Sequence, residues 1–196
     1  SSKNLLSFIA ALPKITFSTP TSIYFWIVSK LLFNSTSAGS KDFGLTNKIE
    51  WLDAIFDLYK LSAEHGNGLA QSNLGLMYEL GNVVEQNHIE AFRLFKLSAE
   101  QGIKEGQSNL GRIYEKGLGV SQNYTEAVKW YQLSAEQGFK DGQTNLGLMY
   151  EKGNGVLQDN KEAVKWFKLS AKQGSMEAQS NLGVIYKNGS GVPQDN

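Results

Sequence analysis

The side chains that could do chemistry are few in this chain, and they do not combine into a reactive group. There is no cysteine, so neither a disulfide framework nor a thiolate zinc site can form. The two histidines, His65 and His88, stand far apart in the sequence, which is typical of surface residues and not of a metal cluster. We therefore expect no metal, no cofactor and no enzyme. A hydrolase is the alternative from another class, and it would need a reactive serine with a base, which the sequence does not display.

Glycine-rich turns are the second candidate for chemistry. Gly117-Leu-Gly-Val, Gly153-Asn-Gly-Val and Gly189-Ser-Gly-Val have the composition of a phosphate-binding loop. They lack the preceding strand and the following lysine that such a loop requires. Their repetition favours a role in turn geometry, with Asn123 and Asp159 placed to cap the next helix.

The charge balance argues against a polyanionic partner. The chain has 19 basic and 19 acidic residues, and lysines sit beside glutamates throughout, as in Glu115-Lys116. Nucleic-acid-binding proteins usually display a basic stripe, which is not visible here. We expect no nucleic-acid partner.

The sequence repeats itself at an offset of 36 residues. Two blocks keep this step, and each occurs four times. One block begins at Leu61, Leu97, Leu133 and Leu169, and the other is Asn-Leu-Gly at Asn73, Asn109, Asn145 and Asn181. A period of this length indicates a repeat architecture in which each unit buries its apolar face against its neighbours.

Apolar spacing within a unit predicts two helices and hence an all-α, right-handed α-solenoid of helical hairpins. A glycine inside each first helix, such as Gly111, would cost about 1 kcal/mol against alanine in an isolated helix, so we expect close packing there. We interpret Trp130 and Trp166 as core residues, and the repeated asparagines as bonded to neighbouring backbone. The expected first helices are 69–80, 105–116, 141–152 and 177–188, and the expected second helices are 48–65, 88–101, 124–137 and 160–173.

The order Leu-Gly, Tyr, Gly-x-Gly-Val, Ala-Val-Lys-Trp-Tyr and Ser-Ala-Glu-Gln-Gly resembles the Sel1-like repeat, a relative of the tetratricopeptide repeat. The resemblance implies an adaptor or scaffold that assembles protein complexes, in signalling or in membrane-associated degradation machinery. Residues 48–66 resemble only a second helix, and the last unit stops after its turn, so we expect further repeats or a dimer partner at that end. The expected units are a leader at 1–47, a degenerate helix at 48–66, repeats at 67–102, 103–138 and 139–174, and a truncated repeat at 175–196.

The exposed positions of the first helices are the candidate binding surface, because these helices line the concave face of such a solenoid. We expect a peptide segment or helix with apolar anchors, whose basic residues meet a row of glutamates; the alternative is that the row is merely solvated. On this hypothesis Glu79→Lys with Glu151→Lys weakens binding without unfolding the array. The candidate residues are Leu76, Glu79, Ser108, Arg112, Glu115, Thr144, Leu148, Glu151 and Lys187.

The first 47 residues differ in character from the repeats. The apolar stretches 5–12 and 15–33 are interrupted, for example by Pro20 and Lys30, and fall short of the roughly 20 apolar residues of a membrane span. We interpret this segment as a capping or poorly ordered leader, with a targeting segment as the alternative and membrane association confined to residues 1–33. We expect a cytoplasmic protein. The alternative is a membrane-tethered adaptor of the endoplasmic reticulum lumen in protein degradation, where the sequons at Asn34, Asn123 and Asn188 would carry glycans.

Overall fold

The computed structural model describes residues 48–189, and all regular structure in this range is helical. The expected leader (1–47) and residues 190–196 lie outside the described residues. The chain divides into two compact units, 1–61 and 62–196. The described part of the first unit is residues 48–61, which belong to α3 (Lys48–Glu64). Within residues 48–189, no helix combines the length and apolar character needed to cross a bilayer.

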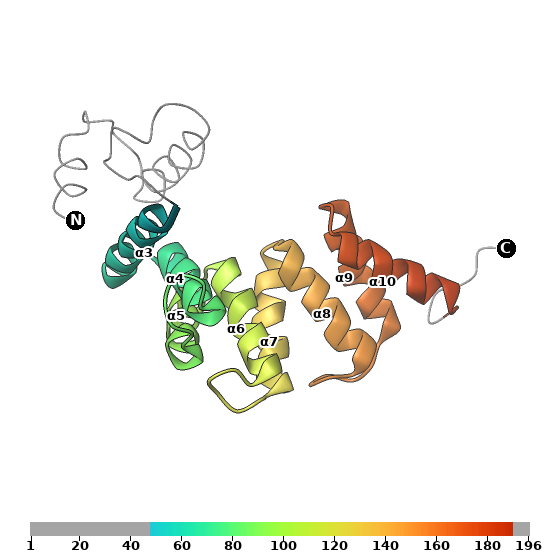
Figure 1. The fold of residues 1–196 in the computed structure, drawn as a ribbon. Coiled ribbons are helices and arrows are strands. Elements are labelled where there is room, and N and C mark those ends of the chain that lie inside the picture. Colours follow the sequence, from blue (N-terminus) through green and yellow to red (C-terminus); the bar gives the residue numbers. More distant parts are fainter. Residues whose placement is uncertain (1–47, 190–196) are drawn as a thin grey trace, which may run out of the picture. The chain divides into compact units, whose positions relative to one another are not determined.

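The second unit is an array of antiparallel hairpins (Figure 1). Its helices pair with their neighbours in sequence, and the first helices also contact each other, α4 with α6 and α6 with α8. The observed bounds differ from the predicted ones by at most one residue at either end, so the prediction of an α-solenoid is confirmed. The helices are α4 (Gly68–Leu80), α5 (His88–Glu100), α6 (Lys104–Lys116), α7 (Tyr124–Glu136), α8 (Lys140–Lys152), α9 (Asn160–Lys172) and α10 (Met176–Lys187).

The expected caps are present at the turns between paired helices. The Asn123 side chain accepts a hydrogen bond from the amide of Glu126, and Asp159 accepts from Glu162. Gly119, with φ of 71°, lies where a side chain would meet the His88 carbonyl at 2.5 Å, at the start of the preceding hairpin's second helix. This glycine is therefore needed both for its positive φ and for close backbone approach.

Glycines inside the first helices form notches for aromatic rings. A Cβ added at Gly111 would lie 2.7 Å from Cδ1 of Tyr131, and one at Gly147 would lie 2.6 Å from Cε1 of Phe167. Both rings are fully buried. The expected close packing is confirmed, and Trp130 and Trp166 pack as half-buried residues at the margin of the same core.

A ladder of buried glutamines connects successive repeats. Gln107 donates to the carbonyl of Ala99, near the end of the preceding second helix, and accepts a hydrogen bond of 2.7 Å from Gln137. Gln143 repeats this arrangement with Ala135 and Gln173. Each ladder glutamine thus adds a side-chain hydrogen bond to a carbonyl at a helix end that already accepts one from the backbone of the following turn.

Candidate functional site

A groove of about 360 Å³ runs across the first helices of the second unit. Each first helix contributes side chains at the same repeat positions, so the groove is built by the periodicity of the sequence. Its lining includes Ser72, Asn73 and Leu76 from α4, Ser108, Asn109 and Arg112 from α6, Asp141, Thr144 and Asn145 from α8, and Glu177 from α10.

Four of the nine candidate binding residues line this groove, namely Leu76, Ser108, Arg112 and Thr144. The hydroxyl-bearing edge is much less accessible than expected, because Ser108 and Thr144 are only 5% and 3% exposed. The other five, Glu79, Glu115, Leu148, Glu151 and Lys187, are not among the lining residues. The binding role of the nine residues stays a prediction.

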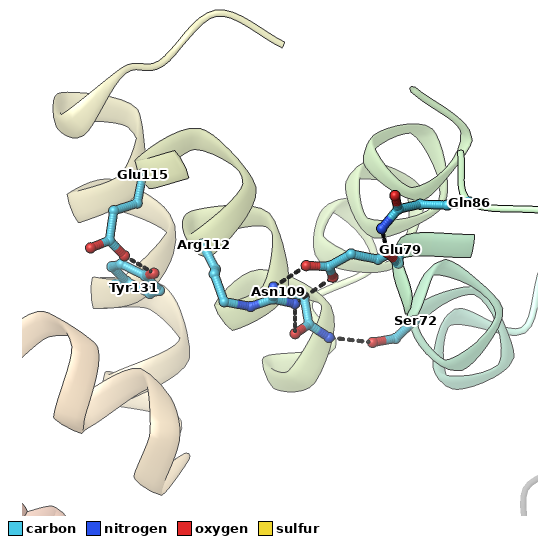
Figure 2. A network of polar contacts seen from close by, with 7 residues as sticks. All are labelled: Ser72, Glu79, Gln86, Asn109, Arg112, Glu115 and Tyr131. Atoms are coloured by element: carbon cyan, nitrogen blue, oxygen red, sulfur yellow. Dashed lines mark hydrogen bonds and ion pairs between the residues drawn. The ribbon is translucent and has the colours of Figure 1, made fainter. Parts of the chain in front are cut away.

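Glu79 is not the solvent-facing carboxylate that the sequence suggested. It is 8% exposed, and both its oxygens are bound by the guanidinium of Arg112 from the next repeat, one of them at 2.6 Å from Nη2 (Figure 2). Arg112 also donates to Asn109, which donates to the Ser72 hydroxyl. A lysine at position 79 would face Arg112 with like charge, so we expect Glu79→Lys to destabilise the array and not to act on binding alone.

Glu115 is also committed to an internal partner. The buried hydroxyl of Tyr131 donates to Glu115 at 2.6 Å (Figure 2). At the equivalent positions the neighbouring repeats have Phe95 and Phe167, which carry no hydroxyl. Within the described residues, Glu151 has no recorded side-chain hydrogen bond or ion pair, so it alone of the predicted glutamate row is uncommitted.

These two contacts shift the pKa of their members. Burial lowers the pKa of Arg112, but its hydrogen bond and attraction to Glu79 outweigh this, and the net shift is upward. Burial, reinforced by the carboxylate of Glu115, raises the pKa of the Tyr131 hydroxyl far above its ordinary value. Arg112 therefore stays charged and Tyr131 stays neutral at physiological pH.

The repeated asparagines do not bond to neighbouring backbone as expected. Asn109 is held by side chains, through Ser72 and Arg112. Asn73 and Asn145 line the groove, and no hydrogen bond of their side chains is recorded in the described part of the chain. Their amides are available to a ligand as both donors and acceptors.

A row of carboxylates that was not among the expected binding residues lies along the groove. Glu105, Asp141 and Glu177 line it at intervals of 36 residues, one in the first turn of each of α6, α8 and α10. The signal was present, because these positions follow the 36-residue period. The expected binding residues all lie later in each first helix than these three carboxylates.

The groove lining is rich in groups that can form hydrogen bonds. It holds amides, hydroxyls, carboxylates and the guanidinium of Arg112. No group of three or more metal-ligating residues occurs among residues whose structure is described. What the arrangement can do is hydrogen-bond an elongated ligand along several repeats.

The chain belongs to the Sel1 repeat family, whose model matches residues 68–103, 104–139, 140–175 and 177–196. Members of this family are generally protein-interaction scaffolds and are typically non-catalytic. The resemblance inferred from the sequence is confirmed. No match was found among curated proteins.

The chain is similar to several solved structures, among them the following three. A protective antigen of uropathogenic Escherichia coli with an SLR fold is 41% identical over 68% of this chain, with a TM-score of 0.65, and the chain covers 29% of its length. A Sel1 repeat protein from Oxalobacter formigenes is 29% identical over 97% of this chain and 73% of its own, with a TM-score of 0.73. Cysteine rich protein B of Helicobacter pylori is 24% identical over 69% of this chain and 98% of its own, with a TM-score of 0.54, a likeness of fold alone.

Proposed function

We propose that this chain is a non-enzymatic scaffold that binds an extended segment of another protein in the groove across α4, α6 and α8. The observation that carries the proposal is the groove itself, which presents the same residue types from successive repeats. A ligand that follows the array therefore meets equivalent contacts at each step.

The asparagine amides supply the recognition. Asn73 and Asn145 have donor and acceptor groups directed at no recorded partner, and an extended segment has unpaired main-chain N–H and C=O groups. Leu76 adds an apolar contact in the same groove. Main-chain hydrogen bonds would provide affinity, and side-chain contacts would provide selectivity.

Site-specific photo-crosslinking tests this proposal. A benzoyl-phenylalanine at Leu76 places the reactive group in the groove, and one at Leu133, an exposed leucine of α7, is the matched control. We expect the Leu76 probe to cross-link a defined segment of a partner protein in cell extract, and the Leu133 probe not to do so. Identical cross-linked peptides from both positions, or none from Leu76, would contradict the proposal.

A further inference from the structure

We infer that the groove selects a segment in the polyproline II conformation that carries a basic residue at every third position. This inference rests on the proposed function and specifies the chemistry of the partner. The feature behind it is the row formed by Glu105, Asp141 and Glu177, called here the acidic row.

The acidic row differs from the other carboxylates at helix starts. The second helices also have a glutamate in the first turn, and each binds a basic side chain three residues on: Glu90 with Arg93, Glu126 with Lys129, and Glu162 with Lys165. For the acidic row, no such ion pair is recorded in the described residues. The residues three positions after the members of the acidic row are Ser108, Thr144 and Ser180, which carry no charge.

The groove therefore presents negative charge that no ion pair among the described residues neutralises. The one cation among its lining residues is Arg112, which Glu79 already holds. Lys104 packs over the ring of Phe139 at 5.9 Å and is not a lining residue. A cationic segment is the complementary ligand, and contact with it would be weakened by salt.

The spacing of the repeats selects the conformation of that segment. Two pairs of first helices are in contact, α4 with α6 and α6 with α8, and packed helices are about 8–10 Å apart. A polyproline II helix rises about 3.1 Å per residue with three residues per turn, so every third side chain lies on one face at about 9 Å intervals. In a β-strand, by contrast, side chains three residues apart point to opposite faces.

The asparagine amides fit the same conformation. A polyproline II segment has no internal hydrogen bonds, so its main-chain groups are free to pair with Asn73 and Asn145. The acidic row and the asparagines are four positions apart on each helix, at 105 and 109 and at 141 and 145, and thus lie on one helix face. One bound segment can contact both.

The test uses the full chain and three labelled peptides of one composition, built from proline, serine and three lysines. The lysines are two, three or four residues apart, and NMR titration follows the side-chain amide signals of Asn73 and Asn145. We expect the three-residue spacing to bind about tenfold tighter than either isomer, since each exposed ion pair contributes modestly and three add up. Asp141→Asn should remove most of this advantage, whereas Glu136→Gln, on the exposed side of α7, should not.

The outcomes separate this inference from the proposed function. Equal affinity for all three isomers, with the asparagine signals shifting in each case, would overturn the inference and leave the groove as a binding site. Tighter binding of a glutamate-containing counterpart would also overturn it. An absence of any shift with every peptide would overturn the inference, whereas the proposed function is tested separately by the cross-linking at Leu76.

Discussion

Three glutamates at the same repeat position meet three different environments in this molecule. Glu79 is bound by Arg112, Glu115 accepts a hydrogen bond from Tyr131, and Glu151 has no recorded side-chain partner in the described residues. The repeated carboxylate is thus satisfied by whichever neighbour carries a suitable donor. A buried carboxylate without such a donor would be costly.

The pair formed by Glu79 and Arg112 should contribute to stability through coupling between two repeats. We expect Arg112→Leu to lower the free energy of unfolding by about 2 kcal/mol, because it leaves a buried carboxylate unpaired; the partial exposure of Arg112 moderates this cost. Glu79→Gln should be less damaging. Urea denaturation of both single variants and the double variant measures their coupling, which we expect to exceed about 1 kcal/mol.

Glu151→Gln is the matched control for this double-mutant experiment on Glu79 and Arg112. Because Glu151 occupies the same repeat position without a recorded partner, its replacement should change the free energy of unfolding by less than about 0.5 kcal/mol. Strictly additive effects of Glu79→Gln and Arg112→Leu would contradict the coupling.

The Tyr131 hydroxyl should make stability fall at alkaline pH. Its pKa in the folded protein is raised above the ordinary value of 10.0, so above about pH 10 the unfolded chain ionises while the folded chain does not. The stability from this group is therefore fully present below that pH and is lost as pH rises. Tyr131→Phe removes the effect at a cost of about 1 kcal/mol at neutral pH.

Denaturation curves of the native chain and Tyr131→Phe, recorded from neutral to strongly alkaline pH, check this. The stability difference between them should be constant up to about pH 10 and shrink above it. Because the upward-shifted pKa values of Tyr59 and Tyr114 affect both proteins, they cancel in the comparison. A difference independent of pH would rule out the raised pKa of Tyr131.

At the scale of the element, a glycine inside a helix lowers helix propensity, and close packing explains why it is present. Gly75, Gly111 and Gly147 each receive an aromatic ring of the paired second helix, whereas no described atom lies within 4 Å of the place where a Cβ of Gly183 would be. The same sequence motif therefore serves a filled notch in three helices and, among the described residues alone, an unfilled one in α10.

This contrast gives a matched pair of substitutions. Gly111→Ala should lower the free energy of unfolding by about 1–3 kcal/mol, because the new methyl group collides with the Tyr131 ring. Gly183→Ala should raise it by about 1 kcal/mol, since the helix gains propensity without a collision. Thermal denaturation of both variants measures this, and a stabilising Gly111→Ala would refute the notch.

The elements could be predicted from the sequence more fully than the site. Helix bounds and the glycine notches follow from periodicity, because four copies of each signal reinforce one another. The pairing of Glu79 could not be predicted in this way, because its partner Arg112 stands where the other repeats have Leu148 and Val184. A contact that occurs in a single repeat leaves no periodic signal in the sequence. Such a contact also depends on side-chain geometry across the repeat boundary.

At the scale of the whole array, each repeat is attached to the next by the glutamine ladder as well as by apolar packing. Gln107 lies at such a boundary, with bonds to Ala99 before it and Gln137 after it. In an array of this kind stability is close to a sum of unit and nearest-neighbour contributions. A substitution at one boundary should therefore destabilise only the helices next to that boundary.

Gln107→Leu tests this locality. We expect a loss of about 1 kcal/mol, since the Ala99 carbonyl loses a buried partner. Amide hydrogen exchange should quicken in α5 and α6 and stay unchanged in α9, which lies beyond the next boundary. Uniformly faster exchange from α4 to α10 would show that the array opens as one cooperative unit instead.

The proposed scaffold role requires that the groove is the surface that binds a partner. The most direct measurement is amide hydrogen exchange of the full chain with and without the partner segment identified by cross-linking. We predict protection concentrated in the first helices α4, α6 and α8, which build the groove. Protection concentrated in the second helices α5, α7 and α9 would contradict the account and move the binding surface to the opposite side of the array.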